Sequence, residues 1–174
     1  ERAQGAEKWD VDGRRYIDFK MGSASQMLGH SHPDVVEAVQ RAATTAIFSA
    51  DCHIGEIEWA EWVNQLLPSA ERTRFCASGS EATMLAIRLG RAFSSKPGVL
   101  RIDGHYHGWH DHALKGAKPG SERATSLGVP QAISDLITVC AANPQAMESA
   151  LQDADIVTVI IEASGANYGL VPLT

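Results

Sequence analysis

From Arg72 onward the sequence alternates between short runs of β-prone residues and longer stretches with helical periodicity. The β-prone runs lie at residues 73–76, 99–102, 136–139 and 156–161, and the helical patterns at residues 81–92 and 144–151. Parallel strands need a crossover between them, usually a helix, so this alternation is typical of a mostly parallel sheet covered by helices. The last run has no polar alternation, which predicts a strand covered on both faces. The second part of the chain is therefore expected to be α/β.

The N-terminal part follows a different plan, with a hairpin and two helices. Residues 8–19 predict two short strands around the Asp12-Gly13 turn, because Asp-Gly supplies the positive φ that a tight hairpin needs. Pro33 suits a first helical turn, and apolar residues then recur at helical spacing for about four turns. A second helix is predicted from about Glu56 to Leu67, where Pro68 ends it.

Composition excludes several classes of partner. The chain has 174 residues, 44% of them hydrophobic, and a net charge of −6, which offers no electrostatic footprint for nucleic acid or an anionic membrane surface. No apolar run approaches the roughly 20 residues of a membrane helix, and the first residues lack the apolar core of a signal peptide. We therefore expect a cytoplasmic protein. Cys52, Cys76 and Cys140 show no paired spacing and are expected to be reduced thiols.

A turn of small residues between a predicted strand and a predicted helix, at residues 75–82, is the strongest local chemical signal. Free N–H groups and the positive end of a helix dipole favour an anion such as a phosphate. Gly79 would let the backbone approach the anion, and the hydroxyls of Ser78 and Ser80 would donate to it. The alternative is a plain helix cap by Ser78 or Ser80, with Glu81 favourable in the first turn.

Residues 105–112 hold four of the seven histidines, directly after a predicted strand. One interpretation is zinc, because neutral imidazoles at this spacing suit that metal, although Trp109 stands where binuclear hydrolases have an aspartate. A solvated loop is another, but it leaves the interleaved aromatic residues unexplained. In the third, Tyr106 or a histidine stacks on a planar heteroaromatic cofactor near the phosphate turn. Its position after a strand favours this last interpretation.

The segment from Lys115 to Pro130 is rich in Gly, Ser, Lys and Pro and has no period. It predicts a mobile surface loop, with a lid as one interpretation.

Together these segments resemble the class III aminotransferases and glutamate-1-semialdehyde aminomutases, which are fold-type-I enzymes of pyridoxal 5'-phosphate (PLP). The resemblance runs over nearly the whole chain. Its motifs lie at residues 9–19, 28–33, 78–83, 86–91, 104–108 and 160–172. It implies an α/β fold in which residues 1–55 are an N-terminal segment of the small domain or dimer arm. Residues 56–174 would then be the first part of the large, mostly parallel-sheet domain that binds PLP.

The same resemblance implies roles for individual residues. Gly79 and Ser80, with Ser78 beside them, would hold the cofactor phosphate. Tyr106 would stack on the pyridine ring with His107 beside it. Glu162 and Asn167 would border the ring edge, with a paired carboxylate at a strand end and a turn residue as the alternatives.

The activity implied is transfer of an amino group, by a transaminase or an aminomutase, on a small amino acid or amino-aldehyde, in a homodimer. Two departures from the family's pattern concern this implied activity. Ala163 stands where the family has proline. The family's aspartate for the pyridine nitrogen and its Schiff-base lysine both fall after Thr174, and no lysine of this chain has the family's lysine context. The chain alone is therefore expected to be inactive, and an inactive scaffold of the same fold is the alternative.

Overall fold

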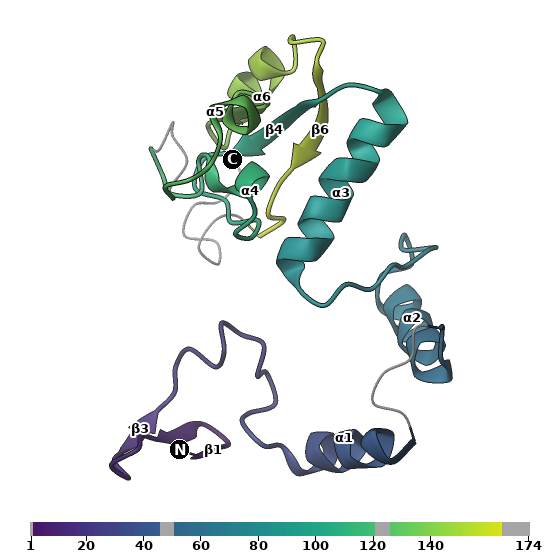
Figure 1. Ribbon diagram of the computed structural model, residues 1–174, viewed down its shortest axis with the longest axis vertical. Coiled ribbons are helices and arrows are strands. Elements are labelled where there is room, and N and C mark those ends of the chain that lie inside the picture. Colours follow the sequence, from purple (N-terminus) through teal and green to yellow (C-terminus); the bar gives the residue numbers. More distant parts are fainter. Residues whose placement is uncertain (1, 46–50, 121–125, 165–174) are drawn as a thin grey trace. The chain divides into compact units, whose positions relative to one another are not determined.

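The computed structural model describes residues 2–45, 51–120 and 126–164, and the chain divides into two compact units, residues 1–73 and 74–174 (Figure 1). The first unit contains β1 (Arg2–Gln4), β2 (Glu7–Trp9), β3 (Arg15–Ile17), α1 (Pro33–Thr45) and α2 (Ile54–Leu66). The second contains α3 (Gly79–Ser94), β4 (Gly98–Ile102), α4 (Asp111–Leu114), α5 (Gln131–Ser134), β5 (Ile137–Cys140), α6 (Pro144–Ala150) and β6 (Ile156–Ile160). The domain boundary expected at residue 55 concerns the complete protein and stays a prediction.

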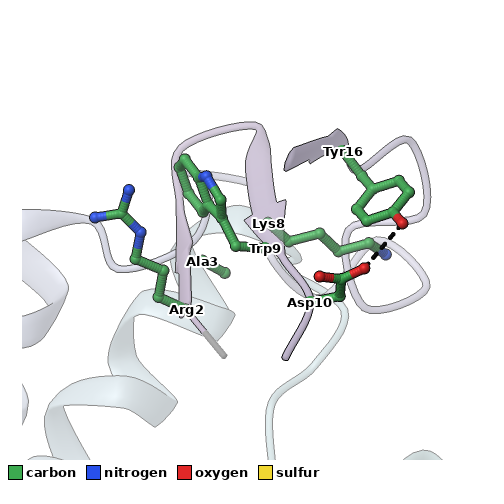
Figure 2. Close-up of a pocket in the computed structure, with 6 residues that line it drawn as sticks. All are labelled: Arg2, Ala3, Lys8, Trp9, Asp10 and Tyr16. Carbon is green, nitrogen blue, oxygen red and sulfur yellow. Dashed lines mark hydrogen bonds between the residues drawn. The ribbon is translucent and has the colours of Figure 1, made fainter. Parts of the chain in front are cut away.

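The predicted hairpin is confirmed as β2 and β3, and β1 extends it to a three-stranded antiparallel sheet. Gly13 adopts a φ of 79°, and the Asp10 carboxylate accepts the backbone N–H groups of Asp12 and Arg14 at 3.0 and 2.9 Å. This carboxylate therefore organises the turn. Figure 2 shows a hollow on this sheet, where the Arg2 guanidinium lies 4.1 Å from the centre of the Trp9 ring.

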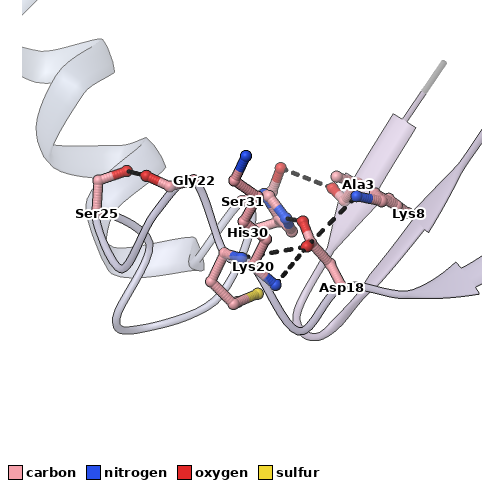
Figure 3. A network of polar contacts seen from close by, with 9 residues as sticks. Ala3, Lys8, Asp18, Lys20, Gly22, Ser25, His30 and Ser31 are labelled. Carbon is pink, nitrogen blue, oxygen red and sulfur yellow. Dashed lines mark hydrogen bonds and ion pairs between the residues drawn. The ribbon is translucent and has the colours of Figure 1, made fainter. Parts of the chain in front are cut away.

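A buried carboxylate ties the segment after β3 to this sheet (Figure 3). Asp18 is 8% exposed and accepts hydrogen bonds from His30 Nε2 at 2.8 Å and from the backbone N–H of Lys20 at 2.9 Å. Lys8 Nζ lies 3.3 Å from the same carboxylate. The hydrogen bond from His30 is the main cause that holds the pKa of Asp18 well below its usual value. Paired backbone hydrogen bonds between Gly5 and His30 close the connection.

Both predicted helices of the first unit are confirmed, as α1 and α2. The imidazole of His53 caps α2 by accepting the Gly55 N–H at 2.9 Å, so this helix begins two residues before the predicted start at Glu56. No residue of α1 or α2 is buried, and the apolar side chains of α1 remain accessible.

The second unit is built on a parallel sheet with the strand order β5-β4-β6. All residues of the central strand β4 are buried, and Ile87 of α3 joins Val99 and Ile137 in the core. Figure 1 shows α3 alongside β6, and the two elements approach closely at Gly90. A Cβ at Gly90 would lie 2.1 Å from the Thr158 hydroxyl, so the glycine is what allows this packing. The predicted α/β organisation is confirmed.

Two expectations for this unit need correction. Residues 73–76 form no strand, because no described strand pairs with them, and a β conformation is held by its ladder of hydrogen bonds. Strand β6 is only partly covered, with Val159 exposed, since it lies at one edge of the described sheet.

The mobility expected of residues 115–130 stays a prediction. At the start of this segment, Lys115 Nζ donates to the Ser134 and Ile137 carbonyls at 2.9 and 2.6 Å.

In the part of the chain that the structure describes, none of the helices combines the length and the apolar character needed to span a bilayer.

Candidate functional site

The carboxyl ends of three parallel strands meet at one edge of the second unit. Strands β4, β5 and β6 end at Ile102, Cys140 and Ile160, and parallel strands present the segments that follow them on the same side. Tyr106 and His107 follow β4, and Glu162 follows β6. This edge therefore brings together residues that are more than 50 positions apart in sequence.

The structure of the α3 N-terminus is compatible with both interpretations of its small-residue turn, a helix cap and an anion site. Ser78 caps the helix, since its hydroxyl accepts the Glu81 N–H at 3.3 Å, and Glu81 accepts the Ala77 N–H at 2.7 Å in return. Glu81 is thus occupied by capping. The N–H groups of Gly79 and Ser80 have no acceptor among the described residues. A Cβ at Gly79 would meet no heavy atom within 4 Å, so space is open where an anion would lie.

The loop after β4 is held against this helix start. Ser80 Oγ accepts the Trp109 N–H at 3.2 Å, and the Thr83 hydroxyl donates to the His107 carbonyl at 2.6 Å. Gly108 has a φ of 105°, and a Cβ there would lie 2.4 Å from Ser80 Oγ. Only glycine fits both the backbone conformation and the space. The structure therefore places Ser80 beside the loop that carries Tyr106 and His107.

Glu162 links the loops that follow β4 and β6. Its carboxylate accepts the backbone N–H of Tyr106, and its own N–H donates to His105 Nδ1 at 2.9 Å. The Tyr106 side chain is 63% exposed, so its ring face is free to receive a planar group. These contacts are consistent with the interpretation of Glu162 as a carboxylate at a strand end. Its position near Tyr106 is also consistent with a residue that borders the edge of a cofactor ring.

Arg101 is a buried cation beneath this edge that sequence reasoning did not single out. It is 0% exposed, and its guanidinium donates to the carbonyls of Ala113 and His105. Burial lowers its pKa to about 10, while Asp103 and Glu162 act in the opposite sense, so it stays charged at neutral pH. A charged residue inside the apolar run Val99 to Ile102 was the available signal.

Of the four clustered histidines, His105, His110 and His112 each have a different hydrogen-bond partner. His105 Nδ1 accepts from Glu162, His110 Nε2 lies 3.1 Å from the Thr83 hydroxyl, and His112 Nε2 accepts from Arg91 at 2.9 Å. His107 is 6% exposed, and its Nε2 has no hydrogen-bond partner among the described residues. Burial lowers the pKa of all four imidazoles, that of His107 to about 4. They are therefore neutral at physiological pH.

This arrangement does not favour the zinc interpretation. Among residues 2–45, 51–120 and 126–164, no three His, Cys, Asp or Glu side chains lie together as a set that could hold a metal ion. The hydrogen-bonded nitrogens of His105, His110 and His112 contact three different partners instead. The hollow of Figure 2 belongs to the first unit and contains none of the predicted site residues. Asn167, the remaining predicted site residue, lies outside the described residues.

Comparison with known proteins identifies the family. The family model for class-III aminotransferases matches residues 1–174. The chain belongs to this family. It is 38% identical over 180 residues to a glutamate-1-semialdehyde 2,1-aminomutase of Desulfotalea psychrophila, and 40% identical over 180 residues to one of Sorangium cellulosum. These alignments cover 99% and 98% of the chain but only 41% and 40% of the relatives, so the chain spans about two fifths of their length.

Solved structures of a transaminase and an aminomutase share the fold. An omega-transaminase from Sphaerobacter thermophilus superposes with a TM-score of 0.91 at 31% identity, over 100% of this chain and 42% of that one. A glutamate-1-semialdehyde aminomutase from Pseudomonas aeruginosa gives 0.74 at 25% identity, over 91% of this chain and 36% of that one. The chain therefore has the fold of the N-terminal part of fold-type-I transaminases, as predicted.

Proposed function

We propose that this chain is part of a PLP-dependent enzyme that transfers an amino group on a small amino acid or amino-aldehyde. The convergence of the α3 N-terminus with the loops after β4 and β6 carries the proposal. It is supported by a solved relative described as a transaminase with PLP bound, which is 30% identical and has a TM-score of 0.91. Both transaminases and aminomutases are among the relatives. The run from Met21 to Met27 lacks the tryptophan that is typical of the aminomutases, which favours transamination.

The described residues fit the cofactor's chemistry. The open space at Gly79 and the N–H groups of Gly79 and Ser80 suit a phosphate, with Ser78 capping the helix behind them. The exposed ring of Tyr106 suits the face of a pyridine, and His107 lies beside it as a neutral imidazole. Glu162 would border the ring edge from β6, with Asn167 following in the same segment.

When bound, the cofactor supplies an electron sink for the substrate's amino carbon, and a lysine supplies the covalent anchor and moves the proton. Within this chain the residues bind and orient. The helix N-terminus would hold the phosphate and Tyr106 would cover one ring face, while Glu162 keeps the Tyr106 backbone in place. Because the clustered histidines are neutral, the positive charge buried beneath the site is that of Arg101.

We place the anchoring lysine in a part of the protein outside this chain, as in the sequence-based prediction. Two lysines of the second unit support this, because their amines already donate to backbone carbonyls: Lys96 to Ala154, and Lys115 to Ser134 and Ile137. By the same reasoning, the 174-residue chain would not catalyse the reaction by itself. A homodimer and a cytoplasmic location are part of the proposal.

The test uses the chain expressed with its natural continuation. We expect a PLP absorbance band near the visible edge that borohydride fixes covalently, and tighter binding of PLP than of pyridoxal because the helix N-terminus favours the phosphate. Tyr106→Ala should weaken PLP binding about two- to tenfold by loss of stacking, while Tyr106→Phe keeps the ring and the affinity. Absence of PLP uptake would contradict the proposal, and uptake without amino transfer would favour an inactive scaffold.

A further inference from the structure

Two loops of the second unit are joined by a reciprocal pair of hydrogen bonds. The imidazole of His105, in the loop after β4, accepts the backbone N–H of Glu162 at 2.9 Å. The carboxylate of Glu162, in the loop after β6, accepts the backbone N–H of Tyr106. Each loop therefore uses one side chain to hold the backbone of the other, and Tyr106 is the residue held.

The structure also determines which form of His105 makes this contact. Nδ1 accepts from an amide N–H, so it must be bare, and a neutral ring then carries its proton on Nε2. The ring is 0% exposed, and the His105 carbonyl accepts from the guanidinium of Arg101. A second positive charge in this buried place would be unfavourable. Burial, and then the charge of Arg101, lower the pKa of His105, against the effect of Glu162.

We propose that His105 is a positioning residue for the cofactor face: by holding the Glu162 backbone, it places the carboxylate that orients Tyr106. This inference rests on the proposed function, since it concerns the ring that would stack on PLP. His105 itself touches no reacting atom. Because Nδ1 of His105 carries no proton, asparagine should replace this residue: its Oδ1 is likewise bonded to Cγ and accepts a hydrogen bond. Leucine should not, because it has no acceptor.

Amide hydrogen exchange in the cofactor-free protein, expressed with its natural continuation, tests the contact directly. His105→Leu should speed exchange of the Glu162 amide about tenfold, because this amide loses its acceptor. Exchange of the Tyr106 amide should also become faster, because the Glu162 carboxylate that accepts it is no longer held in place. His105→Asn should keep both rates within about threefold of the unsubstituted protein. His112→Leu is the matched control, because that imidazole pairs with Arg91 and should leave both amides unchanged.

The cofactor provides the second readout. His105→Leu should weaken PLP binding about two- to tenfold and reduce the visible circular dichroism of the bound ring, and His105→Asn should restore both. On a Glu162→Ala background, His105→Leu should add no further loss, which separates positioning from general destabilisation. Equal behaviour of the leucine and asparagine variants would overturn the inference. No PLP uptake by the unsubstituted protein would instead refute the proposed function.

Discussion

At the scale of single residues, the clustered histidines act mainly as connectors between backbone segments. A neutral imidazole offers one donor and one acceptor on a rigid ring, so it can join two elements without bringing a charge into the interior. His105 contacts the loop after β6 through Glu162, and His110 and His112 contact α3 through Thr83 and Arg91. Connection between elements, together with the packing of Arg101 beneath them, accounts for their density in sequence.

Because the imidazole of His107 is buried, we expect the stability of the protein to depend on pH. Its pKa is about 4 when folded and about 6.5 when unfolded, so the unfolded chain binds the proton first as the pH falls. The contribution of His107 to the free energy of unfolding should therefore be complete above about pH 6.5. It should decrease as the pH falls toward about 4, with a slope of up to about 1.4 kcal/mol per pH unit.

Urea denaturation of the unsubstituted protein and His107→Gln from pH 4 to pH 8 measures this contribution. The glutamine variant should show the shallower slope. Equal slopes for the unsubstituted protein and His107→Gln would contradict the prediction.

At the scale of elements, the site depends on how closely α3 can lie against β6. The helix begins with the Ser78 cap and the open space at Gly79, and its middle reaches the sheet through Gly90. Glycine within a helix normally costs about 1 kcal/mol relative to alanine. Its presence here is explained by the Thr158 hydroxyl, which occupies the place of a Cβ.

Gly90→Ala should therefore destabilise the protein by about 1–3 kcal/mol, although alanine has the higher helix propensity. The double variant Gly90→Ala, Thr158→Ala should recover most of this loss, because it removes the hydroxyl and methyl nearest to the new Cβ. Gly79→Ala is the matched control for stability, since its Cβ meets open space. Thermal unfolding measures all three, and a stabilised Gly90→Ala variant would contradict the close approach.

At the scale of the whole molecule, apolar side chains remain exposed on described elements of each unit. Val39 of α1 is 61% exposed, and Leu89 and Phe93 of α3 are 61% and 96% exposed. Leu89 and Phe93 are four residues apart on α3 and so lie on one face of it, and exposed apolar side chains on one face mark a place where another part of a protein packs. The relatives are about two and a half times as long as the chain, since it covers 41% of the first of them.

We therefore expect the isolated 174-residue chain to bind a hydrophobic dye such as ANS more strongly, per residue, than the chain joined to its natural continuation. Phe93→Ser should lower the dye fluorescence of the isolated chain, because it removes the most exposed of these rings. Phe75→Ser, at a less exposed ring, is the comparison. Equal dye binding by the short and the long protein would show that the continuation leaves these faces open.

Sequence alone determined the features that depend on neighbouring residues. The Asp12-Gly13 turn, the start of α1 at Pro33 and the turn and helix that begin at Ser78 follow from local backbone preferences, and the periodic runs indicated the parallel sheet. The motifs at residues 78–83 and 104–108 were recognised by their resemblance to those of the class III aminotransferases.

The tertiary structure decided what depends on contacts distant in sequence. Residues 73–76 have β-prone side chains but form no strand, because a strand requires a neighbour to complete its hydrogen bonds. The burial of Arg101, the need for glycine at position 108 and the bond between His105 and Glu162 arise where separate strand ends meet. The sequence located the turn predicted to bind phosphate and the aromatic loop. Only the fold brought them to one edge, since parallel strands end on the same side.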